Sequence, residues 1–206
     1  MNLGLPFQVE SEDGQTYTID AFEASLERIQ RLWDHFGRHR VLFCDQMHGD
    51  FDAFVNMILS RNTVVLTVDD VGIVYATGVV PGYSAEAHFF FWDLVSRGRH
   101  RVILQAVKWG MDQFDLHRMD MLVPKHAYAA LHRIYHIGFR LEGLKRRAQL
   151  FDGQWHDMLE FGILREELTD EALRTGKLER VEAERGWFGL LGKDVKLMNY
   201  IMRRPE

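Results

Sequence analysis

One junction constrains the fold of this 206-residue chain most: an aromatic strand, a basic glycine turn and a helix follow one another directly. The strand is expected to end at residues 89–92, the turn spans residues 97–101 around Gly98, and the helix covers residues 102–114. The first amides of a helix have no partner within it and, with the helix dipole, favour an anion. Glycine allows close backbone approach, and arginine binds phosphate bidentately. The junction therefore predicts a diphosphate cradle, with an ordinary solvated loop as the alternative.

An antiparallel meander is predicted in front of this junction, from β-branched and alternating segments separated by turn residues. Its three strands are expected at residues 63–68, 72–80 and 85–92, and a separate short strand at residues 16–19. Asp20, with Glu23 three residues later, has the pattern of a capping box, and predicts a helix that ends at Gly37. A second helix is expected over residues 51–59.

Behind the junction the pattern alternates between strand and helix. A strand is expected over residues 119–123, a helix over 127–137 closed by Gly138, and a strand pair over 140–151 and 158–164. Strand, helix, strand, helix, strand is the βαβ signature of an α/β layer. The predicted fold class is therefore α/β with a mixed sheet, an antiparallel meander followed by βαβαβ.

The C-terminal stretch adds a charged helix over residues 169–185 and an apolar tail. This tail either packs back on the sheet or makes a subunit contact, so a homodimer is one expectation.

Charge and cysteine content narrow the function classes. The net charge of −5 disfavours a non-specific nucleic-acid binder, so no nucleic-acid partner is expected. The single cysteine, Cys44, suits a reducing compartment. No run of 18 apolar residues and no basic start before an apolar stretch occur, which predicts no membrane span and no signal peptide. We expect a cytoplasmic protein.

Three landmarks in this order resemble the GCN5-related N-acetyltransferases, and most closely the branch that acetylates the N-terminal alanine of ribosomal proteins. The first is the turn Arg97-Gly98-Arg99 after an aromatic strand. The second is the sequence IGFRLEG at residues 137–143, similar to the end of that family's last core helix. The third is FDGQWHD at residues 151–157, similar to the hairpin before its closing strand.

The resemblance implies a GNAT-like acyl-CoA N-acyltransferase fold over residues 1–168, with an extension over 169–206. It implies transfer of the acetyl group of acetyl-CoA to a primary amine by direct attack, with acetyl-CoA as co-substrate and no metal. The amine acceptor is a peptide N-terminus or a small molecule. A catalytically impaired CoA-binding or protein-interaction module on the same fold is the alternative.

Carried over residue by residue, the resemblance places the CoA diphosphate on the turn around Gly98. His100 and Val95 depart from the small residue and the Gln or Arg that the family has at these positions. The candidate cofactor-binding residues are Phe91, Trp92, Arg97, Gly98, Arg99, His100, Arg101, Val102 and His132.

The candidate catalytic residues are Glu86, His88 and Tyr135. Glu86 matches the acidic residue of the branch and is the candidate base through water, and His88 lies two residues on, hence on the same face of the strand. A solvated carboxylate and a structural histidine are the alternatives. Tyr135 is the candidate acid for the leaving group, although the family's tyrosine position holds Ile134 and its asparagine position holds Ala127.

A metal site is not expected. His132 and the histidine four residues later could chelate an ion from one helix face, but the spacing supplies no third ligand.

Overall fold

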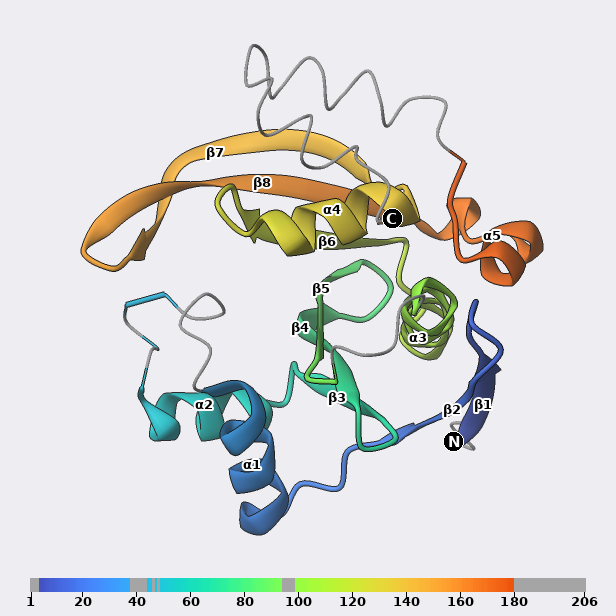
Figure 1. Ribbon diagram of the computed structural model, residues 1–206, viewed down its shortest axis with the longest axis horizontal. Helices are drawn as coiled ribbons and strands as arrows, with labels where there is room; N and C mark the ends of the chain where they lie inside the picture. The colour runs from blue at the N-terminus through green and yellow to red at the C-terminus, as the bar shows by residue number, and fades with distance from the viewer. Residues whose placement is uncertain (1–3, 38–43, 46, 48, 94–98, 180–206) are drawn as a thin grey trace.

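An eight-stranded mixed sheet forms the centre of the computed structural model, with strand order β1-β2-β3-β4-β5-β6-β8-β7 (Figure 1). The structure describes residues 4–37, 44, 45, 47, 49–93 and 99–179. The strands are β1 (Phe7–Glu10), β2 (Thr16–Ala21), β3 (Val64–Val68), β4 (Gly72–Val80), β5 (Ser84–Phe91), β6 (Arg118–Pro124), β7 (Arg140–Phe151) and β8 (Gln154–Leu164). The mixed sheet and the meander of β3 to β5 confirm the predicted fold class.

Helices cover both faces of this sheet (Figure 1). They are α1 (Leu26–Leu32), α2 (Phe51–Ile58), α3 (His100–Gln113), α4 (Tyr128–Ile137) and α5 (Asp170–Thr175). The larger core lies under α3 and α4, where Ala85 and Ala87 of β5 face Val107 and Leu131. The smaller core lies under α1 and α2, around Phe54. Among the described helices, none is long and apolar enough to cross a membrane.

The pairing of β5 with β6 decides where a ligand can enter the sheet. It is the one parallel pairing among the described strands, and it covers only residues 84–86 of β5 and 118–120 of β6. After the pair Glu86–Asp120 the strands separate: β5 goes on pairing with β4 up to Phe91, and β6 with β8 up to Pro124. Both strands therefore present an edge with no strand partner to the opening between them, which we call the β5–β6 opening.

The predicted helix start at Asp20 is wrong. Strand β2 continues through Ala21, which pairs with Leu66 of β3. The helix α1 begins later, where the side chain of Ser25 accepts a hydrogen bond from the amide of Arg28. The capping-box pattern at Asp20 does not start a helix, because the backbone N–H and C=O groups of β2 form hydrogen bonds within the sheet instead.

The C-terminal helix is shorter than predicted. Gly176 ends α5 in the left-handed conformation at φ 70°, so the helix expected over residues 169–185 stops at Thr175 in the part of the chain that is described. Behind it, Leu178 is buried in the larger core, and its amide donates to the Ile137 carbonyl at 2.7 Å. The division at residue 168 stays a prediction, and the apolar tail lies outside the described residues.

Candidate active site

Two predicted catalytic residues lie together on β5, at the point where β6 separates from it. Ala85 and Ala87 face the larger core, so Glu86 and His88 face the side of α1 and α2. The His88 Nε2 atom lies 2.9 Å from the Thr77 hydroxyl and 3.7 Å from a carboxylate oxygen of Glu86. The Tyr75 ring stacks on the His88 ring with 4.5 Å between centroids.

Burial gives these two groups opposite shifts of pKa. It lowers the pKa of His88 to about 4, so the imidazole is neutral at pH 7. It raises the pKa of the Glu86 carboxyl; the charge of Lys145 opposes this, and the charges of Asp120 and Glu160 add to it. A carboxyl whose pKa is raised toward neutrality is suited to accept and release a proton, whereas His88 is held by Thr77 and Tyr75 as a neutral neighbour.

Beyond Glu86, the same side of the sheet carries an excess of acid. Arg118 binds both Asp120 and Glu142, and Lys145 binds Glu160 at 2.8 Å. The charged side chains of this acidic face are Glu86, Asp120, Glu142, Glu160, Arg118 and Lys145. Because Arg118 and Lys145 offset only two of the four carboxylates, the face favours a cation.

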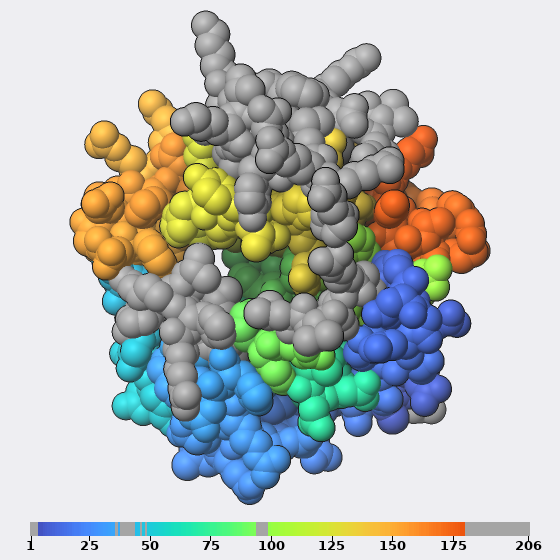
Figure 2. All heavy atoms as spheres, viewed as in Figure 1, coloured from blue at the N-terminus to red at the C-terminus, as the bar shows by residue number. Residues whose placement is uncertain are grey.

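A clasp joins the loop before α2 to the turn of the β7–β8 hairpin. The two carboxylate oxygens of Asp45 accept hydrogen bonds from the amides of Asp152 and Gly153, at 2.7 and 2.8 Å. The Asp45 amide donates to the Leu150 carbonyl at 3.0 Å. Figure 2 shows a hollow below the yellow surface of α4, with green at its floor. The clasp therefore ties the hairpin to the N-terminal half at the acidic side of the sheet.

On the opposite side, two arginines converge on the aromatic end of β5. The Arg99 guanidinium carbon lies 4.8 Å from the centre of the Phe91 ring, and that of Arg133 lies 5.7 Å from it. The side chain of Arg99 is 2% exposed, and its Nη2 atom is 3.5 Å from Asp93. Its Nε and Nη2 atoms have no hydrogen-bond partner in the described part of the chain. Burial lowers the pKa of Arg133, and the charge of Arg99 adds to this.

Three histidines surround this pair of arginines. His132 and His136 lie one turn apart on α4, with 3.1 Å between their Nε2 atoms. Burial lowers the pKa of His100 to about 4, and the charges of Arg133, His136 and Lys177 add to the shift. The region is thus rich in cations and hydrogen-bond donors. We call it the cationic cluster; its residues are Arg99, His100, His132, Arg133 and His136. Buried guanidinium N–H groups with no acceptor are what a polyphosphate would satisfy.

The first turn of α3 is partly occupied by the protein itself. A carboxylate oxygen of Glu12, from the β1–β2 turn, accepts a hydrogen bond from the Arg101 amide at 2.8 Å. A Cβ added at Gly176 would lie 2.9 Å from that amide nitrogen, so only glycine fits there. The predicted use of the Arg101 amide for a phosphate therefore competes with Glu12, whereas the buried Nε of Arg101 has no partner among described groups.

The remaining predicted residues are spread over both sides. The Trp92 indole donates to the Asp70 carbonyl at 2.6 Å and stacks on His35, so it belongs to the smaller core. Val102 is fully buried, and Tyr135 is 5% exposed inside the larger core. Arg97 and Gly98 lie outside the described residues, so the cradle around them stays a prediction.

Sequence reasoning missed three residues of this site. Arg133 lies within the helix predicted over residues 127–137. Its position next to His132 and near His136 is the sequence feature that could have indicated a site residue. Glu12 and Asp45 act across 89 and 108 residues of sequence, and no local pattern indicates such contacts.

The chain matches no family model, and no curated protein matches it significantly. Solved structures do resemble it. Spermidine N-acetyltransferase from Vibrio cholerae, in complex with CoA and spermine, superposes with a TM-score of 0.60 at 17% identity, over 73% of this chain and 97% of the other. RimJ of Mycobacterium smegmatis, in complex with CoA-disulfide, gives 0.59 at 19% identity, over 82% and 91%. The fold is that of the GCN5-related N-acetyltransferases. At these identities the likeness shows the fold alone, and activity must be argued from the site.

Proposed function

We propose that this protein is an acyl-CoA-dependent N-acetyltransferase that acts on a primary amine. The observation that carries the proposal is the β5–β6 opening, with the cationic cluster on one side of the sheet and the acidic face on the other. A polyanionic donor and a cationic acceptor would enter from these two sides and meet at the unpaired edge of β5. Such juxtaposition turns a bimolecular reaction into a local one.

The cationic cluster fits the phosphates of the donor. Acetyl-CoA would supply the acetyl group as a thioester. Arg99 and Arg133 would hold its phosphates, because the Nε and Nη2 atoms of Arg99 have no acceptor among the described residues. The turn around Gly98 would add backbone amides, as the sequence predicts. The free edge of β5 beyond Glu86 offers backbone N–H groups that can stabilise charge on the carbonyl oxygen.

The acidic face fits the acceptor. An amine arrives at neutral pH as an ammonium ion and must lose a proton before it can attack. Glu86 is the proposed base, directly or through a water, because burial raises the pKa of its carboxyl. The new C–N bond forms as the C–S bond breaks, and CoA leaves as a thiol after taking a proton. Both spermine, bound by the Vibrio enzyme, and a peptide N-terminus carry the required amine.

Calorimetry with acetyl-CoA, followed by a thiol-release assay against amines and peptide N-termini, tests this proposal. We expect saturable binding of acetyl-CoA and thiol release with at least one amine. The Gly98→Asp variant should lose acetyl-CoA binding, because a carboxylate there repels the diphosphate. Absence of binding at about 1 mM acetyl-CoA, far above a micromolar affinity, contradicts the proposal.

One observation favours the impaired CoA-binding module. Ile134, at the family's tyrosine position, is 1% exposed, and its neighbour Tyr135 is buried in the core. If no other donor protonates the leaving thiolate, the protein would bind CoA without turnover. The same two assays separate the cases, since the module predicts binding but no thiol release with any amine.

A further inference from the structure

A polar pocket lies beyond the end of β6, between the start of α4 and the β7–β8 hairpin. Its volume is about 330 Å³, within the size range of small-ligand sites. The residues that line it are Lys125, His126, Tyr128, Arg147, Trp155, His156 and Asp157. None of these residues belongs to the cationic cluster or to the acidic face. We call it the hairpin pocket.

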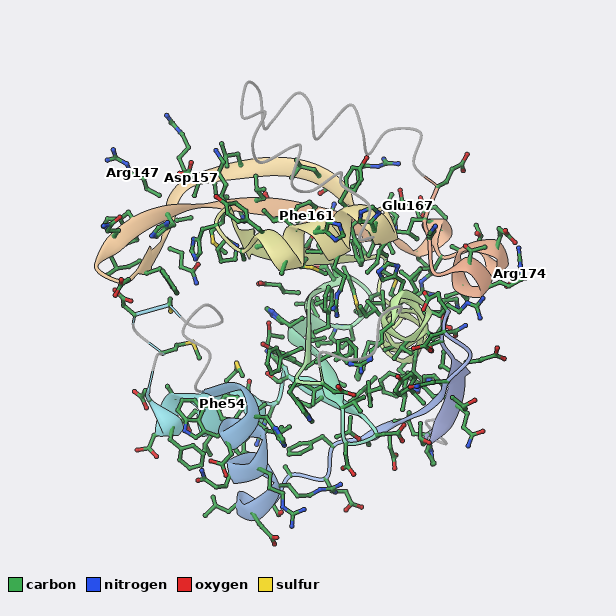
Figure 3. The ribbon with its side chains drawn as sticks, in the orientation of Figure 1. Phe54, Arg147, Asp157, Phe161, Glu167 and Arg174 are labelled. Atoms are coloured by element: carbon green, nitrogen blue, oxygen red, sulfur yellow. The ribbon has the colours of Figure 1, made fainter. Side chains whose placement is uncertain are left out.

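Positive charge and donors prevail in this pocket. Lys125 and Arg147 contribute cations, and Arg146 lies beside Arg147 in the adjoining hollow. The single carboxylate, Asp157, already accepts a hydrogen bond from the Arg147 amide at 2.9 Å. Figure 3 shows Arg147 and Asp157 close together on the hairpin, at the opposite end of the molecule from Arg174.

One histidine of the pocket, His126, has hydrogen-bonding groups that no described residue uses. Both ring nitrogens of His126 are buried and have no partner within the described residues. The rings of His126 and His156 lie 4.5 Å apart, and burial together with His156 lowers the pKa of His126. The first turn of α4 begins beside them, and its N-cap residue Ala127 offers no side-chain cap. A phosphate oxygen would accept hydrogen bonds from the single N–H of the neutral His126 ring and from the first amides of α4.

The pocket also displays aromatic surface. Among the described residues, three aromatic side chains are exposed, and two of them, Trp155 at 59% and Tyr128 at 48%, line this pocket. Exposed aromatic rings next to cations are suited to stack a flat base while the cations hold its phosphate.

We propose that the hairpin pocket binds a nucleotide, with its base stacked on Trp155 and its phosphate held by Arg147, Lys125 and the His126–His156 pair. The nucleotide is either free or one unit of a single strand, since both present the same base and phosphate. The net charge of −5 disfavours binding of long nucleic-acid strands elsewhere on the surface, so the proposed nucleotide recognition is confined to this pocket.

The hairpin pocket and the proposed CoA site share helix α4 but no lining residue. Tyr128 begins α4, whereas His132, Arg133 and His136 lie further along the helix toward α3. The test therefore uses uridine nucleotides, which share no base with CoA, and full-length protein with and without saturating CoA.

The experiment is calorimetric titration of UMP and of hexauridylate. We expect binding, weakened about tenfold or more by Trp155→Ala, which removes the stacking surface, and by Arg147→Glu, which repels the phosphate. Tyr83→Ala is the matched control for loss of an exposed aromatic ring, and Arg174→Glu for the same change in net charge. Both controls should bind within about twofold of the wild type.

The two ligands identify the source. Equal affinity for UMP and hexauridylate supports a free nucleotide, and tighter, salt-sensitive binding of hexauridylate supports a strand. No binding of either at about 1 mM overturns the proposal. Nucleotide binding whose affinity is unchanged in both Trp155→Ala and Arg147→Glu, or that disappears when CoA is added, also overturns the proposal. Because the titrations also run without CoA, they remain interpretable if the protein does not bind CoA at all.

Discussion

At the scale of single residues, Phe91 is the most informative side chain of the molecule. Its ring ends β5, is 7% exposed, and lies within 6 Å of the guanidinium carbons of Arg99 and Arg133. Cation–π contact is worth about 0.5–2 kcal/mol, which does not offset the loss of hydration at the Nε and Nη2 atoms of Arg99, which have no hydrogen-bond partner among the described residues. The arrangement therefore costs stability in the free protein, as expected of a site that is completed by an anion.

Arg99→Met should separate binding from stability. The variant removes a buried charge and leaves an apolar side chain of similar length against Tyr17 and Phe91. We expect Tm to stay equal or rise, since the variant removes buried guanidinium nitrogens without a hydrogen-bond partner among the described residues, and Asp93, 41% exposed, keeps its hydration. We expect the Kd for acetyl-CoA to rise about 10–100-fold, the loss of one or two charged hydrogen bonds. Calorimetry and thermal melts measure both, and Arg174→Met is the exposed control.

A lower Tm together with unchanged acetyl-CoA affinity would show that Arg99 is a structural residue and not a ligand for phosphate.

Glu86→Gln should remove the proposed base without affecting the donor. We expect kcat to fall about 10²–10⁴-fold, with the Kd for acetyl-CoA unchanged. Burial raises the pKa of Glu86 above its usual 4.5, so wild-type activity should fall as the pH drops through that raised value. Glu142→Gln removes the same charge from the same face and should alter acceptor KM but not kcat. If both variants lose kcat equally, Glu86 acts through charge alone.

At the scale of elements, the sequence predicts well where a local signal suffices. Gly138 closes α4 at φ 96°, as its position after an apolar helix face predicts. Asp50 caps α2, accepting a hydrogen bond from the Ala53 amide at 2.8 Å. The predicted cap at Asp20 fails because the pairing of Ala21 with Leu66 depends on a strand more than 40 residues away. The pattern of β6 and β8 likewise gives no register, so it could not show that β8 inserts between β6 and β7.

Asp45→Ala should loosen the hairpin from the N-terminal half. The variant removes both hydrogen bonds to the turn amides of Asp152 and Gly153. Charged hydrogen bonds contribute about 1.5–3 kcal/mol each, so their loss should loosen the hairpin on the acceptor side. We therefore expect the KM for the acceptor to rise about tenfold, with the affinity for acetyl-CoA unchanged. Steady-state kinetics measure this, with Asp52→Ala on α2 as control. An unchanged acceptor KM would show that the clasp does not shape the acceptor side.

At the scale of the whole molecule, the site depends on contacts between distant segments. Glu12 reaches the Arg101 amide across 89 residues, and Arg133 reaches Phe91 from another element. Composition and periodicity indicated the layers and the sides of the sheet, because these follow from the faces of single elements. The packing of distant segments decides which charged groups contact one another. No local sequence pattern encodes these contacts.

Stability should fall in acid through the buried histidines. Burial lowers the pKa of His88 and of His100 to about 4, against 6.5 when unfolded. The folded state therefore binds fewer protons than the unfolded state between pH 6.5 and 4. The free energy of unfolding should fall as the pH drops through this window, and remain constant with respect to these groups above it.

His88→Gln should flatten that slope, as measured by urea unfolding between pH 4.5 and 7, whereas the exposed control His117→Gln should not. The raised pKa values of Glu12 and Glu86 give slopes of opposite sign, and comparing variants with the wild type isolates the histidine contribution. Equal slopes in wild type and His88→Gln would contradict the burial of a neutral imidazole.

A crystal structure of the protein with acetyl-CoA tests the central claim most directly. The account predicts the thioester arm between β5 and β6, beyond the pair Glu86–Asp120, with phosphate oxygens within hydrogen-bond distance of Arg99 and Arg133. Acetyl-CoA bound elsewhere, with the Nε and Nη2 atoms of Arg99 still without an acceptor among the described residues and the β5–β6 opening filled by protein side chains, would contradict it.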